Sequence, residues 1–409
     1  MMTPLRVLYC TDTYPPQING VSVVTALSVA GLLARGWQVT VISPRYPASE
    51  VNLFENGGGM PSALHHAVVP SVSLPGYSDI RLAAPCTSKV RRLIQNFQPH
   101  LVHSATEFMI GWTGQREAIR QGIPVVSSYH TDFSRYTEAY GMPWLRGTVQ
   151  RYLARFHRRS NRVYTPGLLA GNDLATLGVS NVEIWGRGVD TNLFHPLHRD
   201  RRSIPDMTAG DDPFVFLHVG RLAAEKNVAL IVQAYALARE RLSTTHATRL
   251  IIAGDGPERS ALRRIAGPGV TLLGNLDRQT DLPRLYASAD AFLFASCTET
   301  LGLVILEAMA SGLPVIAAPV GGVADHLRHG ENGLAFMPDD IEGMAAAMVE
   351  MVNNSDERRR LATGARRTAE QLGWDAELDR LDESYRERVI GSAVEGSRLE
   401  HAEPVVVES

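Results

Sequence analysis

The stretch from residue 290 to 322 constrains the fold of this chain more than any other part of the sequence. Residues 290–296 form a short apolar run that is typical of a strand, and a polar loop follows at 297–302. Good helix formers come next and end at Gly312, a residue common just after a helix, and a second apolar run fills 314–318. This strand–helix–strand unit belongs in a parallel sheet, with its polar loop at the carboxyl edge, where such folds bind ligands.

Two carboxylates in this unit are candidate ligand-binding groups. Glu299 lies in the polar loop, and Glu307 lies inside the apolar run of the helix. Because an unpaired buried carboxylate is costly, Glu307 must face water or meet hydrogen-bond donors. The helix start at Leu301, Gly302 and Leu303 exposes free N–H groups and a positive dipole end, which favour a phosphate. One turn later, Glu307 is in position for the ribose of a nucleoside diphosphate, or else it lies on a solvated surface helix.

The composition describes a soluble globular protein. The 409 residues suffice for two domains, with 44% hydrophobic against 20% charged residues. A net charge of −3 argues against a nucleic-acid partner. The cysteines, Cys10, Cys86 and Cys297, form neither a CxxC pair nor a disulfide framework, which is typical of a reducing cytoplasm. Since the start lacks a signal-peptide core and no apolar run approaches about 18–20 residues, we expect a cytoplasmic protein.

The rest of the chain alternates strands and helices in two series. The first begins with a strand at 6–12, a helix at 21–35 and a strand at 37–43, and it lacks the G-x-G-x-x-G turn of a nicotinamide site. The second begins with a strand at 214–220. Further strands are expected at 101–105, 124–129, 249–254 and 270–274, and further helices at 228–242 and 282–288. This alternation predicts an α/β protein with two doubly wound domains.

The whole pattern resembles a known enzyme family. Glu299, seven further residues, Glu307, and the closing run AMASGLPVIAAPVGG resemble the donor-binding signature of glycosyltransferase family four, whose members are retaining enzymes with the GT-B fold. The resemblance covers nearly the whole chain. One departure is Leu301, where the family usually has Phe, and we expect this packing position to have little effect on the chemistry.

The resemblance implies two Rossmann-like domains that face one another across a cleft. The expected parts are an N-terminal acceptor-binding domain (1–196), a polar linker (197–213), a C-terminal donor-binding domain (214–373), a helix returning to the first domain (374–390) and a flexible tail (391–409).

The resemblance also implies roles for donor-site residues. Glu299 would contact the sugar hydroxyls, the amides of Leu301 to Leu303 the diphosphate, and Glu307 the ribose. Arg221 and Lys226 match the family's GR…EK motif and would neutralise the diphosphate, although such residues can also be plain surface charges.

Glycines and one aspartate complete the expected donor site. Gly20 ends the first loop, where backbone would approach the diphosphate, and Asn19 stands where the family usually has another Gly. Gly254 and Asp277 end or follow strands near the expected ribose and base.

Several residues after strands of the first series are expected to face the reacting sugar or the acceptor. His130, in the segment His-Thr-Asp, would lie by the reacting sugar carbon, whereas taken alone it could simply pack beside its loop. Asn19, Glu107 and Asp132 are expected on the acceptor side.

A basic stretch follows at residues 143–162. It has six arginines and no acidic residue, and apolar side chains interleave at roughly helical spacing from Trp144 to Phe156. A basic amphipathic helix of this kind suits an anionic membrane surface, which would make the protein peripheral at the inner face of the cytoplasmic membrane. The alternative is a solvated helix whose apolar face packs on its own domain.

These observations together predict a retaining glycosyltransferase that moves a hexose from a nucleotide diphosphate sugar to a lipid or glycan hydroxyl, with His130, Glu299, Arg221 and Lys226 as its catalytic groups. No cofactor and no metal are expected, because Arg221, Lys226 and the helix start serve the diphosphate and no Asp-x-Asp motif is present. Segments 130–141 and 185–196 are most similar to GDP-mannose-dependent bacterial α-mannosyltransferases, and Asp277 could accept from guanine unless it only caps a helix.

Three alternatives to this interpretation remain open. The donor could be a UDP-sugar of glucose, sulfoquinovose or N-acetylglucosamine. The protein could also be a nucleotide-sugar epimerase, or a nucleotide-sugar binding protein without catalysis.

Overall fold

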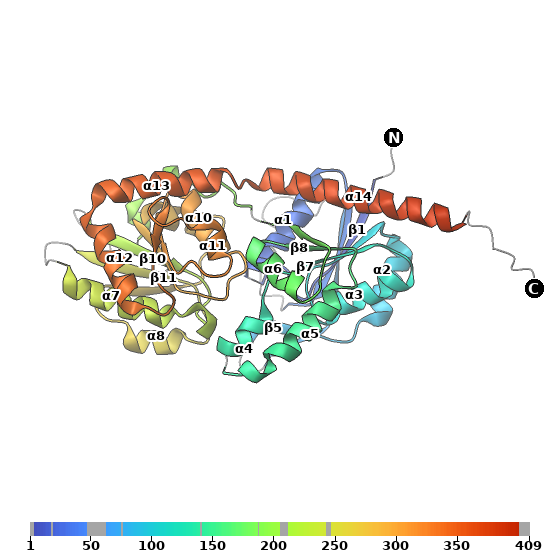
Figure 1. The fold of residues 1–409 in the computed structure, drawn as a ribbon, viewed down its shortest axis with the longest axis horizontal. Coiled ribbons are helices and arrows are strands. Elements are labelled where there is room, and N and C mark those ends of the chain that lie inside the picture. Colours follow the sequence, from blue (N-terminus) through green and yellow to red (C-terminus); the bar gives the residue numbers. More distant parts are fainter. Residues whose placement is uncertain are drawn as a thin grey trace, which may run out of the picture.

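The computed structural model describes residues 4–17, 19–46, 63–74, 77–139, 141–186, 188–204, 212–242 and 247–400. Two parallel β-sheets lie side by side along the long axis of the molecule, each flanked by helices (Figure 1). This arrangement confirms the predicted α/β class with two doubly wound halves. We call them the first half, which contains β1, and the second half, which contains β10.

The first half is built on a sheet with strand order β3-β2-β1-β6-β7-β8-β9, in which neighbouring strands are parallel. Its strands are β1 (Arg6–Cys10), β2 (Gln38–Pro44), β3 (Leu64–Val69), β6 (Leu101–Ser104), β7 (Val125–Ser128), β8 (Arg162–Thr165) and β9 (Val182–Ile184). An antiparallel pair, β4 (Ser71–Leu74) and β5 (Tyr77–Ala83), lies beside it. The helices are α1 (Gly20–Ala34), α2 (Thr87–Phe97), α3 (Met109–Arg120), α4 (Phe133–Ala139), η1 (Pro143–Leu145), α5 (Arg146–His157) and α6 (Leu168–Thr176).

The second half is built on a parallel sheet with strand order β12-β11-β10-β13-β14-β15. Its strands are β10 (Phe214–Val219), β11 (Thr248–Ala253), β12 (Val270–Gly274), β13 (Ala291–Phe294), β14 (Val315–Ala317) and β15 (Gly333–Ala335). The helices are η4 (Ala224–Lys226), α7 (Val228–Arg241), α8 (Arg259–Ile265), α9 (Asp281–Ser288), α10 (Leu303–Ala310), α11 (Val323–His326), α12 (Ile341–Asn353) and α13 (Ser355–Glu370).

The strand order of each sheet reverses beside its first strand. In the first half β1 lies between β2 and β6, and in the second half β10 lies between β11 and β13. Parallel sheets bind ligands at such reversal points, outside the carboxyl ends of the strands. The connections after β10 and β13 contain five of the residues predicted for the donor site, namely Arg221, Lys226, Glu299, Leu301 and Gly302.

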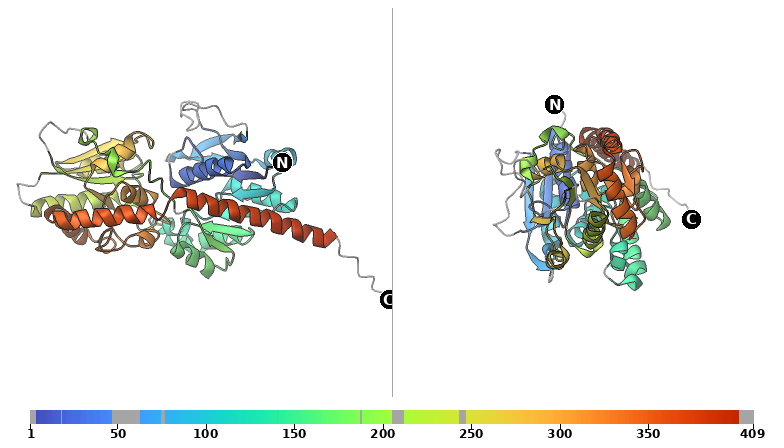
Figure 2. Two further views of the ribbon diagram at one scale, coloured as in Figure 1. Left: turned by 90° about the horizontal axis from the view of Figure 1, so that it is seen from above. Right: turned by 90° about the vertical axis from the view of Figure 1, so that its left-hand side faces the viewer.

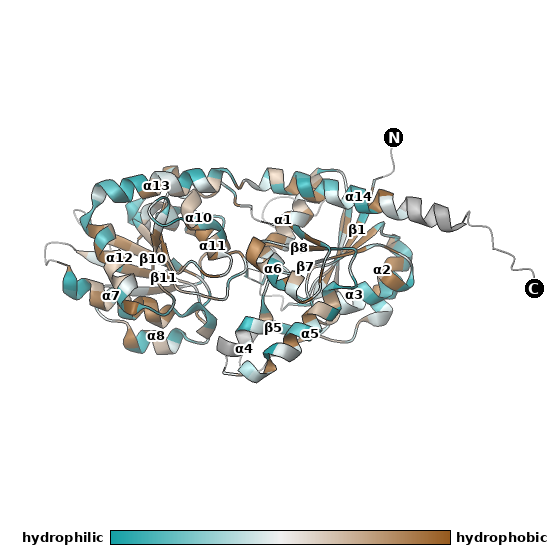
Figure 3. Ribbon diagram, in the orientation of Figure 1, coloured by the Kyte–Doolittle hydropathy of each residue, from teal (hydrophilic) through white to brown (hydrophobic). Residues whose placement is uncertain are grey.

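Apolar strands form the core because helices cover both faces of each sheet. Hydrophobic residues concentrate on the strands, and hydrophilic residues concentrate on outward helix faces such as that of α13 (Figure 3). On α10, the side chains of Ile305, Leu306, Ala308 and Met309 are all fully buried between β13, β14 and α13. None of the described helices has the length and apolar character that crossing a membrane requires.

The chain passes twice between the halves, at two segments that run together. The backbone N–H of Val189 donates to Leu372 O at 2.8 Å, and the Trp185 indole donates to Glu377 O at 2.7 Å. From there α14 (Trp374–Glu400) runs along the first half, as Figures 1 and 2 both show. The Tyr385 hydroxyl of α14 meets the Tyr9 hydroxyl of β1 at 2.9 Å in the buried core.

The end of α14 differs from the sequence expectation. A helix over 374–390 and a flexible tail over 391–409 were expected, yet the helix continues to Glu400, and 401–409 lie outside the described residues. Once a helix is nucleated, each added residue costs little, so glycines at 391 and 396 need not end it.

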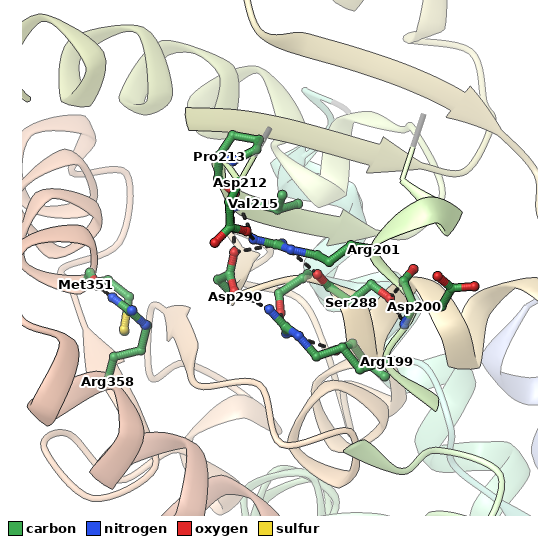
Figure 4. Close-up of polar contacts among 12 residues, drawn as sticks. Arg199, Asp200, Arg201, Asp212, Pro213, Val215, Ser288, Asp290, Met351 and Arg358 are labelled. Carbon is green, nitrogen blue, oxygen red and sulfur yellow. Dashed lines mark hydrogen bonds and ion pairs between the residues drawn. The ribbon is translucent and has the colours of Figure 1, made fainter. Parts of the chain in front are cut away.

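The expected linker at 197–213 also requires correction. The passage between halves comes earlier, near residues 185–189, and Phe194 and Ile204 are already buried in the core of the second half. The charged residues that resembled a solvated linker are instead fixed by the carboxylate of Asp290 (Figure 4). Asp290 Oδ1 accepts from Arg199 Nη2 at 3.0 Å, and Oδ2 accepts from Arg201 Nη1 at 3.0 Å.

Asp290 supports a prediction about stability. Its Oδ2 also accepts from the backbone N–H of Val215 at 2.9 Å, so Asp290→Ala removes a shared acceptor from two arginines and a strand amide. We expect a loss of about 2–3 kcal/mol in the free energy of unfolding, measured by urea denaturation.

Asp212→Ala is the matched control. Asp212 also pairs with Arg201, at 2.7 Å, but its side chain is 85% exposed, so we expect a loss of less than about 1 kcal/mol. Equal losses in the two variants would contradict a structural role for Asp290.

Candidate active site

The connection after β10 contains two cationic side chains, and each forms an ion pair with a carboxylate. The Arg221 guanidinium forms an ion pair with buried Glu225, one helical turn later. The Lys226 ammonium forms an ion pair with Glu299, which belongs to the loop after β13. The two loops are further joined by Ser296, whose hydroxyl donates to Glu225 O at 2.8 Å. The structure therefore brings Lys226 and Glu299 together from positions 73 residues apart.

The helix α10 begins where the sequence predicts a phosphate seat. Gly302, at its N-cap, has φ 73° and ψ 53°, a left-handed conformation that favours glycine. This conformation turns the chain sharply from the Glu299 loop into the helix, and the first N–H groups of α10 have no acceptor within the helix. Leu301 is buried in the core of the second half, in agreement with its expected packing role.

The Glu307 side chain is buried and accepts three hydrogen bonds. Its Oε1 accepts from Arg278 Nη2 at 2.7 Å and Nε at 3.0 Å, and its Oε2 accepts from the Tyr286 hydroxyl at 3.2 Å. The alternative of a solvated surface glutamate is therefore wrong. A carboxylate has about four acceptor positions, so these three bonds leave capacity for one further donor. Arg278 in turn lies over the Phe194 ring, with its guanidinium carbon 5.0 Å from the ring centroid.

The segment after β7 contributes the first half's side of the site. The carbonyl of His130 accepts from the Thr300 hydroxyl, which joins the two halves beside Glu299. Burial, with the nearby His157, lowers the pKa of His130 to about 4, so its imidazole is neutral near pH 7. Asp132 is buried, and its Oδ1 accepts from the Ser134 hydroxyl at 2.6 Å.

A small pocket lies between the halves. It is lined by Tyr129, Asp132, Arg135, Leu169, Ala170 and Asp173 from the first half and by Thr298, Glu299, Thr300, Gly321 and Gly322 from the second. Arg135 bridges Asp132 and Asp173, at 3.1 Å to each carboxylate. The pocket therefore brings the expected acceptor-side residue Asp132 to the same space as Glu299.

Glu107 has a different environment from the one expected. It is buried, its Oε1 lies 3.3 Å from His157 Nε2, and its carbonyl accepts from the Tyr152 hydroxyl. Glu107 is absent from the lining of the pocket, and its acceptor-side role remains a prediction.

The first loop holds Asn19 and Gly20. Asn19 caps α1, because its Oδ1 accepts from the backbone N–H of Ser22 at 2.8 Å, and its Nδ2 donates to Thr13 Oγ1 at 2.8 Å. Gly20 is the first residue of α1, and a Cβ there would meet no atom of the described residues within 4 Å. Neither fold packing nor backbone strain thus explains the glycine, and the open space is compatible with the expected close approach of a ligand.

Gly254 and Asp277 both have structural roles. Gly254 has φ 135°, and a Cβ there would overlap the carbonyl oxygen of Gly220, so packing of the strand ends already requires glycine. Asp277 Oδ1 accepts from the backbone N–H groups of Gln279 at 2.9 Å and Thr280 at 2.8 Å. Although desolvation opposes it, hydrogen bonding from Thr280 and Gln279 lowers the pKa of Asp277. Asp277 therefore does shape the turn before α9, as the capping alternative proposed.

The sequence did not indicate a role for Arg278, Tyr286, Arg135 or Asp173. Arg278, Tyr286 and Asp173 meet their partners through the fold. Arg135 also pairs with Asp132, only three residues away in the sequence. Across the described parts of the chain, no three or more His, Cys, Asp or Glu side chains are grouped so that they could hold a metal ion.

Comparisons with known proteins show which family this chain resembles. Residues 18–193 match the family model described as Glycosyltransferase Family 4, and residues 213–354 match that described as Glycosyl transferases group 1. A GDP-mannose-dependent alpha-mannosyltransferase of Mycobacterium tuberculosis is 31% identical, over 98% of this chain and 100% of the relative. The sulfoquinovosyl transferase SQD2 of Arabidopsis thaliana is 28% identical, over 83% of this chain and 68% of the relative.

One solved structure with a similar fold is that of Anabaena Alr3699/HepE in complex with UDP-glucose. Its TM-score is 0.75 at 20% identity, and the alignment covers 94% of this chain and 100% of that chain. The likeness concerns the fold.

The pairing of Glu307 with Arg278 yields a prediction. Arg278→Leu leaves a buried carboxylate without its cation, and we expect a loss of about 3–5 kcal/mol in the free energy of unfolding. The double variant Arg278→Leu/Glu307→Leu removes both charges and should recover most of this loss, as urea denaturation would measure. Additive losses in the double variant would contradict the pairing.

Proposed function

The chain belongs to glycosyltransferase family 4 and has the GT-B fold, and we propose that it is a retaining hexosyltransferase acting on a lipid or glycan hydroxyl. The observation that supports this best is the pocket between the halves, where Glu299, paired with Lys226, lies with Asp132 of the opposite half. A donor held by the second half and an acceptor held by the first would meet there.

In the proposed complex the donor's diphosphate lies between Arg221, Lys226 and the start of α10. Arginine offers a planar fork of donors and lysine a point charge, and free helix N–H groups add to both. Because these groups strengthen their hydrogen bonds as the leaving diphosphate gains charge, they stabilise the transition state. This compensation comes from the chain itself, so the proposal requires no metal or cofactor.

The proposed transfer occurs on one face of the sugar. The bond from the anomeric carbon to the diphosphate oxygen breaks, the acceptor oxygen bonds to the same face, and the acceptor proton passes to the leaving phosphate. Glu299 and His130 position the sugar, the first with negative charge and the second as a neutral imidazole near pH 7. This route retains the anomeric configuration and needs no dedicated base.

For the donor we propose GDP-mannose. The support is the M. tuberculosis relative, which is named for GDP-mannose and aligned over nearly its whole length. UDP-sugars remain the second candidate. One relative is named for a sulfoquinovosyl group and not for mannose, and HepE, which has a similar fold, was solved with UDP-glucose.

The direct experiment is an assay with GDP-mannose, UDP-glucose and a glycolipid acceptor, with NMR of the product. We expect acceptor-dependent formation of an α-linked product. An epimerase would instead release epimerised nucleotide sugar without acceptor, and a binding protein without catalysis would consume no donor.

The proposed phosphate contacts give the second test. We expect Arg221→Ala and Lys226→Ala each to lower turnover about a hundredfold, roughly 2.7 kcal/mol, because charge-assisted bonds to the leaving group are lost. The control is Arg241→Ala, at the end of α7, where the arginine pairs with exposed Glu342. Near-normal turnover in both site variants, with unchanged circular dichroism, would refute these roles.

The base preference is tested by calorimetry with GDP and UDP. We expect GDP to bind more tightly, with Asp277 accepting from the guanine N–H groups that uracil lacks. Asp277→Asn keeps an acceptor oxygen for the turn before α9 but removes the negative charge. We expect this variant to reduce the difference between the affinities for GDP and UDP. Tighter binding of UDP would overturn the mannosyl donor and leave the glycosyltransferase proposal untouched.

We further propose that α5 contacts an anionic membrane surface. The inward face of α5 packs in the first half, where Leu153 and Phe156 are buried. Trp144 before the helix is 77% exposed, and Arg151 and Arg155 are exposed as well. An exposed indole beside cations is the pattern expected at a lipid interface.

Vesicle sedimentation measures this contact. At about 1 kcal/mol for each arginine near the surface, Arg151→Ala/Arg155→Ala should weaken binding to phosphatidylglycerol vesicles about thirtyfold. Arg359→Ala/Arg360→Ala, on α13, makes the same charge change elsewhere and should have little effect. Vesicle binding that changes with neither lipid charge nor salt concentration would contradict the proposal.

A further inference from the structure

The ion pair between Lys226 and Glu299 joins two groups that have separate tasks in the proposed function. Lys226 is expected at the diphosphate and Glu299 at the sugar, yet without a donor the two neutralise each other. Because the Glu299 carboxylate neutralises the ammonium that a phosphate oxygen would use, it competes with the diphosphate for Lys226. The following inference rests on the proposed function.

Glu299 can leave Lys226 only by moving its side chain. Its backbone is fixed because its carbonyl accepts from the N–H of Gly322 at 2.7 Å, and a Cβ at Gly321 would overlap the same carbonyl. The Lys226 and Glu299 side chains are 16% and 18% exposed, so neither is fully solvated. A displaced Glu299 carboxylate therefore stays in the same confined region and needs a new partner.

The pocket offers no substitute cation. Among the described residues that line it, Arg135 carries the only positive charge, and both Asp132 and Asp173 already hold it, at 3.1 Å each. A displaced Glu299 therefore has uncharged groups of the pocket, such as the Thr298 hydroxyl, or donors on the ligand as its new partners. Without donors on the ligand it keeps an uncompensated negative charge beside the phosphate, and like-charge repulsion opposes binding.

The two nucleotide ligands differ in this respect. An intact nucleotide sugar carries hydroxyl groups that can donate to the released carboxylate. A nucleoside diphosphate, which is the product, pairs with Lys226 but has no sugar hydroxyl that could donate a hydrogen bond to Glu299. We infer that Glu299 discriminates between donor and product, because it competes with the diphosphate for Lys226 and is compensated only when a sugar is attached.

The direction in which one substitution changes the affinity for GDP and UDP tests this inference. Glu299→Gln removes the carboxylate that pairs with Lys226. We expect GDP and UDP each to bind this variant about three- to tenfold more tightly than they bind the wild type, as measured by calorimetry. The same variant should bind the intact nucleotide sugar less tightly and transfer it more slowly. A residue with a purely structural role, or one that only contacts the sugar, would not tighten binding of a ligand that has no sugar.

A double variant shows whether the effect passes through Lys226. In a Lys226→Ala background, Glu299→Gln should change the affinity for GDP and UDP by less than about twofold. Asp379→Asn on α14 removes one negative charge outside the pocket, where the exposed carboxylate pairs with Arg35, and it serves as the charge control with a similarly small expected effect on the affinity for GDP and UDP. Glu299→Ala repeats the measurement with a different side chain in case Glu299→Gln folds poorly.

Three results would overturn the inference. They are unchanged or weaker GDP and UDP binding in folded Glu299 variants, a gain in affinity that persists in the Lys226→Ala background, and an equal gain in Asp379→Asn. A wild-type chain that binds neither GDP nor UDP and transfers no sugar would instead refute the proposed function, and the inference with it. Wild-type transfer with no affinity gain in the variants refutes the inference alone.

Discussion

Compensation of carboxylate charge at the carboxyl edge of the second sheet determines the form of the site. Glu307 lies in the apolar interior and is stable there because Arg278 and Tyr286 donate to it. Glu299, closer to the pocket, is held by Lys226. In both cases the partner comes from a neighbouring βα loop or helix, so the charges fix how β10, β12 and β13 present their loops to a ligand.

The same principle links the two halves of the molecule. Asp325 of α11 accepts from the N–H of Leu168 at 3.1 Å and so caps α6 from the opposite half. Gly167, which precedes this helix, has no side chain where Asp325 approaches. Thr300, next to Glu299, reaches the carbonyl of His130. The pocket is thus bordered by contacts between the halves that use backbone groups, which leaves the side chains of Asp132 and Glu299 lining the pocket.

The segment that follows the first passage between the halves is fixed as firmly as the sheets. Arg199 and Arg201 both donate to Asp290, whose own N–H donates to Val215 O at 2.8 Å. Asp290 therefore holds residues 199–201 against the start of β10 and the end of α9. The chain passes between the halves before this segment, near Val189 and Leu372, so the segment belongs to the second half.

The sequence by itself determined the alternation of strands and helices, the parallel sheets and the family pattern, because these depend on local periodicity and on short motifs such as Glu299 to Glu307. It also identified Glu307 as a residue that needs donors, since an apolar helix surrounds it. Only the tertiary structure decided which donors these are. Arg278 lies 29 residues from Glu307, and Lys226 lies 73 residues from Glu299, so no local pattern connects them. For the same reason the charged residues 199–201 resembled a solvated linker until the fold placed Asp290 beside them.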